Sequence, residues 1–124
     1  MALSLLIARI IEESYALKRS GDIGAALQRA REALEKARAF GESEASAAAL
    51  VCIARILYYL GHYDEAQTQA EEALAYADSP TRARADALRL LGDCAHEAGN
   101  LIAAERYYQR AIDLSRQVGY AYSL

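Results

Sequence analysis

Residues 61–74 read GHYDEAQTQAEEAL, and two other stretches of the chain repeat the pattern. The stretch at 21–34 is GDIGAALQRAREAL, and the stretch at 99–112 is GNLIAAERYYQRAI. Each begins with Gly and carries small or aliphatic residues at matching offsets. The glycines are spaced 40 and 38 residues apart, and a period in this range indicates stacked supersecondary units. The repeat therefore predicts three copies of one structural unit.

The composition favours helices in every copy. Ala, Leu, Glu and Arg recur throughout, whereas Pro occurs once, and these four residue types are strong helix formers. Apolar residues also follow helical i, i+3, i+4, i+7 spacing, as at Leu50, Ile53, Ala54 and Leu57. We therefore expect an all-α protein of six helices, at about 2–19, 23–39, 44–60, 63–77, 80–97 and 101–118.

Glycines and polar residues mark where these helices end and begin. Gly21, Gly61 and Gly99 are expected to end the first helix of each unit, because glycine adopts the left-handed C′ conformation without strain. Asp22 and Asn100 come directly after two of these glycines and can cap the next helix.

Other helix starts are less regular. His62 follows the middle glycine, with Asp64 nearby as a substitute cap. Ser43 and Ser79 are predicted N-caps, the latter with Pro80 at the first helical position. Because short links make consecutive helices antiparallel neighbours, the predicted fold is an α-solenoid of three stacked antiparallel helical hairpins.

These residues resemble the tetratricopeptide repeat (TPR), a helix–turn–helix unit. In the middle unit the matching residues are Leu50, Ile53, Ala54, Leu57, Gly61, Tyr63, Ala66 and Ala73. In the last unit they are the Leu91-Gly92 pair, Gly99, Leu101, Ala104, Tyr108 and Ala111. The first unit is degenerate, since Glu13 stands where the family has Leu.

The unit length resembles one variety of the family. Units of 38 to 40 residues are similar to the long-helix units of MalT-type bacterial regulators. The resemblance implies a single domain over 1–124, with units at about 1–40, 41–79 and 80–119. Residues 120–124 then read as the start of a further helix.

The resemblance also implies a function. In this family the first helices of successive units line a concave groove that binds peptides, so we expect a non-catalytic protein-interaction scaffold, as in a piece of a larger bacterial signalling or transcriptional regulator. Tyr and Arg are enriched at binding hot spots, although both are also common as packing or solvated residues. The candidate groove residues are Tyr15, Arg19, Arg55, Tyr58, Tyr59, Arg89, Asp93 and His96.

One subtype of the family is excluded by its groove positions. That subtype grips the C-terminal carboxylate of chaperones with three cations and two Asn residues. This chain has Ile11, Tyr15, Arg55, Asp86 and Leu90 there. A carboxylate-clamp co-chaperone is therefore rejected.

Composition and motifs argue against several other classes. The net charge of −3 lacks the basic field that nucleic-acid binding needs, and no stretch reaches the about 18 apolar residues of a membrane span. Cys52 and Cys94 read as small buried hydrophobes, so no metal or cofactor is expected. HEAGN at 96–100 lacks the second His of a zinc protease helix. We therefore expect a cytoplasmic protein that is not an enzyme.

Both ends of the predicted stack look apolar. A terminal repeat needs a polar outer face, and the first predicted helix shows none that is convincing. We expect a homodimer or higher oligomer through the terminal helices. The candidate interface residues are Leu3, Leu6, Ile7, Ile10, Tyr108 and Tyr120. Two alternatives to a peptide scaffold stay open: a homo-oligomerisation module, and a sensor that binds a small effector between units.

Overall fold

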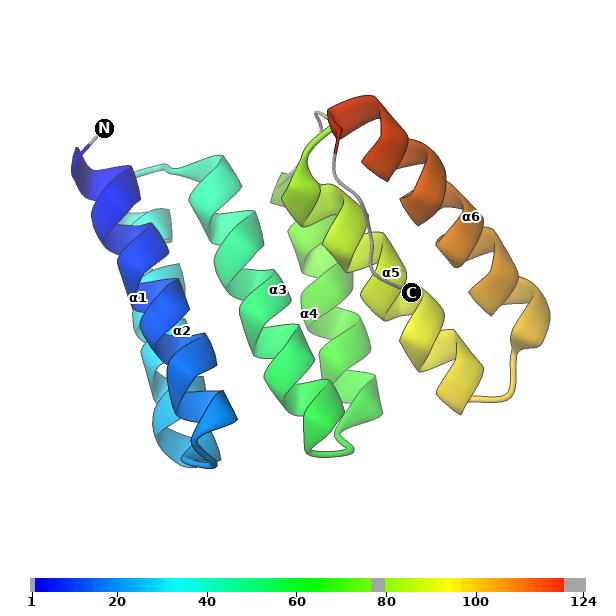
Figure 1. Ribbon diagram of the computed structural model, residues 1–124, viewed down its shortest axis with the longest axis horizontal. Coiled ribbons are helices and arrows are strands. Elements are labelled where there is room, and N and C mark those ends of the chain that lie inside the picture. The colour runs from blue at the N-terminus through cyan, green and yellow to red at the C-terminus, as the bar shows by residue number, and fades with distance from the viewer. Residues whose placement is uncertain (1, 77–79, 120–124) are drawn as a thin grey trace.

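The computed structural model describes residues 2–76 and 80–119, and over these residues it is a row of antiparallel helical hairpins without strands (Figure 1). The helices are α1 (Ala2–Arg19), α2 (Ile23–Ala39), α3 (Ser43–Tyr59), α4 (Tyr63–Tyr76), α5 (Arg82–Glu97) and α6 (Leu101–Val118). The predicted all-α class is confirmed. Each expected helix is present, and its ends agree with the expected ends to within two residues.

The helices are arranged in two layers. Each hairpin pairs α1 with α2, α3 with α4, and α5 with α6, while α3 also packs on α1 and α2, and α5 on α3 and α4. Within the described chain the backbones of α1 and α5 do not come close to each other, and neither do those of α2, α4 and α6. Neighbours in the row therefore supply all the contacts, as in a solenoid. The first helices α1, α3 and α5 form one layer, which faces the viewer in Figure 1.

Four of the connections share one geometry. Gly21, Gly41, Gly61 and Gly99 all have positive φ, between 65° and 91°, which is the left-handed conformation expected of a glycine after a helix. At the α3–α4 turn the Gly61 N–H donates to the carbonyl of Tyr58, and the next N–H donates to the carbonyl of Leu57. These two bonds form a Schellman motif.

The residue after each of these glycines bonds to both helices through its backbone. Its N–H donates to a carbonyl of the preceding helix, and its own carbonyl accepts from an N–H of the next helix. Asp22 accepts a hydrogen bond from the N–H of Ala25, and Asn100 accepts one from the N–H of Ala103, so both predicted caps are confirmed. One residue thus closes one helix and caps the next. The link between the two helices is therefore short, and the chain reverses direction in a tight hairpin.

The start of α3 differs from the prediction. Ser43 is the first helical residue, and Glu42 stands at the N-cap without a side-chain cap bond. The Glu42 carboxylate instead accepts a hydrogen bond from Ser4 on α1, at 3.3 Å. Ser43 is therefore not the N-cap, because the shared turn residue is again the one directly after glycine.

The start of α5 is also corrected. The helix begins at Arg82, and Thr81 is its N-cap, with Oγ1 accepting from the N–H of Arg84 at 3.2 Å. Pro80 therefore precedes the helix rather than opening it. The predicted cap at Ser79 lies outside the described residues.

Small residues line the interfaces within the hairpins. Ala26, Ala30 and Ala33 of α2 are fully buried. The same spacing recurs on α4, where Ala66, Ala70 and Ala73 are also fully buried. Alanine at one-turn steps allows two helix axes to approach closely, while the larger apolar side chains fill the space between units. The largest fully buried ones come from α1 and α3, as at Ile7 and Leu50.

In the third hairpin, different residues allow the two helices to pack closely. Tyr108 of α6 stands where α4 has Ala70, and its ring lies against Gly92 of α5. A Cβ at Gly92 would meet the Tyr108 ring at 2.6 Å, so only glycine accommodates the ring here. The Tyr108 hydroxyl donates to Asp93 at 2.6 Å. Tyr108, a predicted interface residue, is therefore held against its own hairpin.

Both cysteines are buried free thiols. Cys52 donates to the Oγ of Ser14 at 3.4 Å, and Ser14 donates to the carbonyl of Ala26 at 2.6 Å. Burial raises the pKa of the Cys52 thiol. The chain of bonds joins α3, α1 and α2, which agrees with the prediction that Cys52 is a small core residue.

The outer face of α1 also differs from the prediction. Ile7 and Ile10 are 0% and 2% exposed and belong to the core, so they are not available to a partner. Leu5 and Leu6 are 73% and 48% exposed. Farther along the helix the exposed residues include Arg9 and the acidic pair that follows it. The outer face of α1 is therefore apolar near its start and charged beyond it.

Candidate functional site

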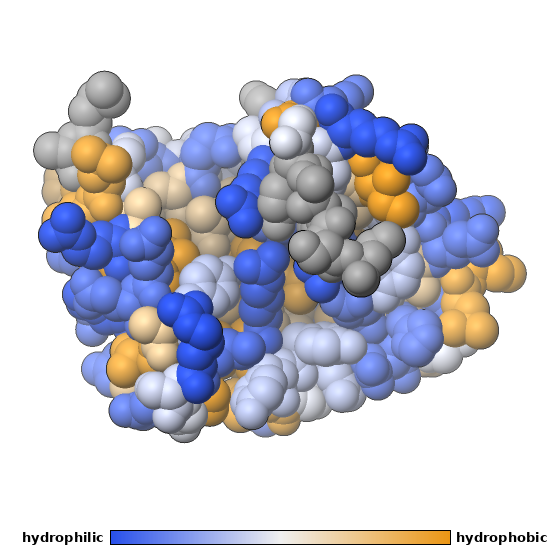
Figure 2. All heavy atoms as spheres, viewed as in Figure 1, coloured by the Kyte–Doolittle hydropathy of each residue, from blue (hydrophilic) through white to orange (hydrophobic). Residues whose placement is uncertain are grey.

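The layer of first helices carries two neighbouring hollows. The N-terminal hollow, near the starts of α1, α3 and α5, has a volume of about 580 Å³. The C-terminal hollow, near their ends, has a volume of about 460 Å³. Figure 2 shows this face, with polar side chains over its middle and hydrophobic ones between them. Together the hollows form the candidate groove.

Arg55 of α3 separates the two hollows and lines both. Its Nη1 donates to the Tyr15 hydroxyl on α1 at 2.9 Å, and its guanidinium lies 5.6 Å from the centre of the Tyr15 ring. Its Nη2 lies 3.3 Å from Oδ1 of Asp86 on α5, and the Asp86 side chain is only 8% exposed. Arg55 therefore ties α1 and α5 to α3 across the floor of the groove.

Tyr15 is held as a neutral phenol in this bridge. Burial raises its pKa, and the charge and hydrogen bond of Arg55 oppose that rise without cancelling it. The neutral hydroxyl accepts the Arg55 hydrogen bond, and the ring face lies close to the same cation, an arrangement that is favourable for a partly buried arginine. Tyr15 and Arg55 thus contact each other first, and a ligand would meet them as one paired surface.

Tyrosines dominate the C-terminal hollow. Tyr58 donates to Oε1 of Glu97 at 3.1 Å, and its ring lies 5.1 Å from that of Tyr63. Burial, together with the hydrogen bond to Glu97, raises the pKa of Tyr58 to about 12. Lys18 Nζ lies 4.7 Å above the ring of Tyr59. The hollow therefore offers aromatic faces beside cations, a combination suited to protein contacts.

Most of the predicted groove residues lie in these hollows. Tyr15 lines the N-terminal hollow, and Tyr58, Tyr59, Arg89 and Asp93 line the C-terminal one. Two predicted residues line neither hollow. Arg19 lines an adjoining hollow of about 720 Å³, which it shares with Tyr15 and Arg55, and His96 is an exposed residue.

The sequence reasoning missed several lining residues. In the C-terminal hollow these are Tyr63 and Glu97, and in the N-terminal hollow they are Ala8, Ala45 and Ala83. The three alanines lie one helical turn before groove positions that the resemblance does assign. Extending the i, i+3, i+4 pattern toward the start of each first helix would have found them.

Comparison with known proteins agrees with this geometry. A family profile described as tetratricopeptide repeat matches residues 45–117, which is more than half of the chain. The chain belongs to the tetratricopeptide-repeat family. The match begins in α3 and leaves out the first TPR hairpin, where Glu13 replaces the Leu of the repeat.

Solved structures support the TPR fold. The crystal structure of the TPR domain of Arabidopsis FLU matches with a TM-score of 0.79 at 21% sequence identity, covering 90% of this chain and 95% of that one. At this identity the likeness concerns the fold alone. No curated protein sequence matches this TPR chain.

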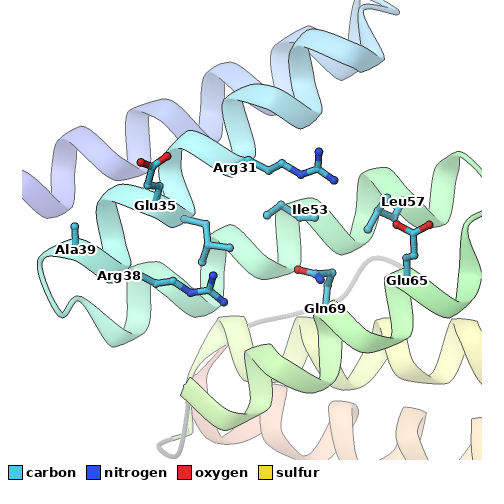
Figure 3. Close-up of a pocket in the computed structure, with 9 residues that line it drawn as sticks. Arg31, Glu35, Arg38, Ala39, Ile53, Leu57, Glu65 and Gln69 are labelled. Carbon is cyan, nitrogen blue, oxygen red and sulfur yellow. The ribbon is translucent and has the colours of Figure 1, made fainter.

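A further cleft lies in the layer of second helices. It runs between α2 and α4 and has a volume of about 640 Å³. Its apolar floor comes from Leu34, Ile53 and Leu57. Figure 3 shows Arg31 of α2 on one side and Gln69 of α4 on the other, with Ile53 between them. The cleft exists because the backbones of α2 and α4 do not come close to each other.

An ion pair spans one end of this cleft. Arg38 of α2 pairs with Glu72 of α4 and also donates to the hydroxyl of Tyr76, at 3.1 Å. The hydrogen bond to Tyr76 and the nearby Glu72 raise the pKa of the Arg38 guanidinium. These contacts hold the two units together where their second helices are otherwise apart.

Neither a membrane span nor a metal cluster is found in residues 2–76 and 80–119 of this TPR chain. No helix there is both long and apolar enough to cross a membrane. No group of three or more His, Cys, Asp or Glu side chains is placed to hold a metal ion.

Proposed function

We propose that this chain is a non-catalytic scaffold that binds a protein or peptide segment along the groove over α1, α3 and α5. The observation that carries the proposal is the row of two hollows on one layer of helices, lined with tyrosines and arginines. Such side chains supply large contact area and directional hydrogen bonds at interfaces. The proposal includes Tyr58, Tyr59, Arg89 and Asp93 as contact residues.

The wider setting is part of the same proposal. Two buried free thiols suit a reducing, cytoplasmic compartment, and a net charge of −3 does not favour nucleic acid. The repeat period of 38 to 40 residues supports a long-helix TPR of the MalT-type variety, within a larger signalling or transcriptional regulator.

Capture of partners by groove variants tests the proposal. Tyr59 is exposed, so Tyr59→Ala combined with Arg89→Glu should alter the groove and keep the helical content seen by circular dichroism. Phe40→Ala removes an equally exposed aromatic ring outside both hollows and is the matched control. We expect partners retained by wild type and by Phe40→Ala to be lost by the groove variant. Equal capture by all three proteins would contradict a groove-binding scaffold.

Self-association is a second candidate function. The observation that favours it is the exposure of Leu5 and Leu6 at the start of α1, since neighbouring exposed aliphatic residues on a terminal repeat attract a partner surface. Of the predicted interface residues, Leu3 is partly buried and Leu6 is accessible, while Tyr120 lies outside the described residues.

A further inference from the structure

We propose that the N-terminal hollow binds a peptide segment that is both aliphatic and basic. This inference rests on the proposed scaffold function, because it names the chemistry of the partner in the same groove. The inference concerns only the N-terminal hollow, which lies between the helix starts and Arg55. It is argued from the side chains that form the floor of this hollow and from the charges at its rim.

The floor of the N-terminal hollow is made of small and aliphatic side chains from all three first helices. The residues are Ala8 and Ile11 of α1, Ala45, Ala48 and Val51 of α3, and Ala83 of α5. Alanine on three neighbouring helices leaves room above the backbone that longer side chains would fill. A hollow of about 580 Å³ over such a floor can bury aliphatic side chains of a partner.

The rim of the same hollow is acidic. Glu12 of α1 and Glu44 of α3 line it and are exposed, and the half-buried Glu42 at the N-cap of α3 lines it as well. Two arginines also line the hollow. Arg55 is engaged with Tyr15 and with Asp86, and Arg82 also makes contacts of its own. The rim therefore carries a surplus of carboxylates, which attracts and orients cationic side chains.

The C-terminal hollow has no such surplus. Three carboxylates line it, those of Asp86, Asp93 and Glu97, beside three cations, those of Lys18, Arg55 and Arg89. Its negative and positive charges are therefore balanced. The acidic surface available to a ligand is greatest in the N-terminal hollow, and this contrast places the basic part of the partner there.

Two matched peptides provide the probe. One is built from Leu, Ala and Lys, and the other has Glu in place of every Lys. Binding is measured by fluorescence anisotropy at low and physiological salt, and the site is located from amide NMR shifts at Ala48 and Val51. The charge-reversed protein is Glu12→Lys with Glu44→Lys. The control is Glu71→Lys with Glu105→Lys, which changes the net charge equally at exposed positions outside both hollows.

We expect the Lys peptide to bind and to shift the amides of the hollow. Charge reversal at the rim should weaken it about ten-fold, the combined effect of two partly screened ion pairs, while the control keeps wild-type affinity within about two-fold. Preference for the Glu peptide, or an equal loss in rim and control variants, would overturn the inference. If a partner captured through Tyr59 and Arg89 binds but the Lys peptide does not, the inference fails and the scaffold function stands.

Discussion

Arg55 of α3 donates a hydrogen bond to the hydroxyl of Tyr15 on α1, 40 residues earlier in the chain, at 2.9 Å. The same guanidinium pairs with Asp86 on α5. The backbones of α1 and α5 do not come close to each other, and this one side chain connects these two helices through the middle one. Arg55 is therefore a structural residue as well as a groove residue, and its variants must be judged by stability before they are judged by binding.

Replacing Arg55 by Met should destabilise the fold. The change keeps much of the aliphatic stem but removes the hydrogen bond to Tyr15 and the ion pair with the nearly buried Asp86 carboxylate. We expect a loss of about 1–3 kcal/mol in the free energy of unfolding, measured by urea denaturation with circular dichroism. Arg106→Met, on the exposed surface of α6, is the control, with an expected change within about 0.5 kcal/mol. Equal stabilities of the two variants would rule out the bridge.

The contact between Gly92 and Tyr108 predicts a second stability effect. An added Cβ at Gly92 would meet the Tyr108 ring at 2.6 Å, so Gly92→Ala should cost about 1–3 kcal/mol of unfolding free energy through overpacking. In a protein that already carries Tyr108→Ala, the clash disappears, and Gly92→Ala should be neutral or slightly stabilising because alanine favours helices. A penalty of the same size in both backgrounds would show that the ring contact is not its cause.

Local signals explain why most of the fold is predictable from the sequence. Asp22 and Asn100 each cap a helix by accepting a hydrogen bond from an N–H only three residues later, and each directly follows a glycine that ends the preceding helix. Such turn signals involve only a few neighbouring residues. Helical spacing of apolar residues then gives the helix positions, and the repeat period gives the stacking.

The errors come from contacts between distant residues. Ile7 and Ile10 look like part of an all-round apolar helix, and only packing against other helices shows that they are buried while Leu5 and Leu6 are not. The pairing of Arg55 with Tyr15 and Asp86 likewise depends on the distances between three helices. The sequence places these residues on one face, but it does not show that they satisfy one another.

The α3–α4 turn offers a stabilising substitution at His62. At the equivalent places Asp22 and Asn100 accept hydrogen bonds from the next helix, whereas the His62 ring lies 3.8 Å from the Glu65 carboxylate. His62→Asp should add an N-cap and a favourable charge at the start of α4, worth about 1 kcal/mol. Thermal unfolding is the measurement. His62→Ala is the control without an acceptor, and equal stability of the Asp and Ala variants would contradict the effect.

The start of α1 predicts how self-association would respond to mutation. Leu5→Glu with Leu6→Glu should convert an oligomer into a monomer in light scattering, because both side chains are exposed and tolerate charge in the folded chain. Glu at Ile10 would not be a clean test, since that residue is buried. Leu101→Glu with Ile102→Glu, exposed at the start of α6, is the control at the opposite end of the row. An unchanged oligomer mass for the α1 variant would reject α1 as the contact.

Alkaline pH should destabilise the fold through groups that burial keeps protonated. Burial and the acidic side chains nearby raise the pKa of Cys94 from 9.0 to about 11, and burial and Glu97 raise that of Tyr58 from 10.0 to about 12. The folded state therefore binds more protons than the unfolded state between these values, and stability falls as pH rises. The contribution is fully present below about pH 9 and is lost progressively toward pH 12.

Tyr58→Phe isolates one part of this pH dependence. The variant has no phenol to ionise, so its stability should fall less steeply than that of wild type between about pH 10 and 12, as measured by urea midpoints at a series of pH values. The half-buried Tyr15 and Tyr108 phenols, whose pKa values are also raised by burial, leave a residual slope in the variant. Tyr59→Phe, at an exposed ring on the same helix, is the matched control. If Tyr58→Phe and wild type lose stability with the same slope, the hydrogen bond from Tyr58 to Glu97 does not hold the phenol in its protonated form.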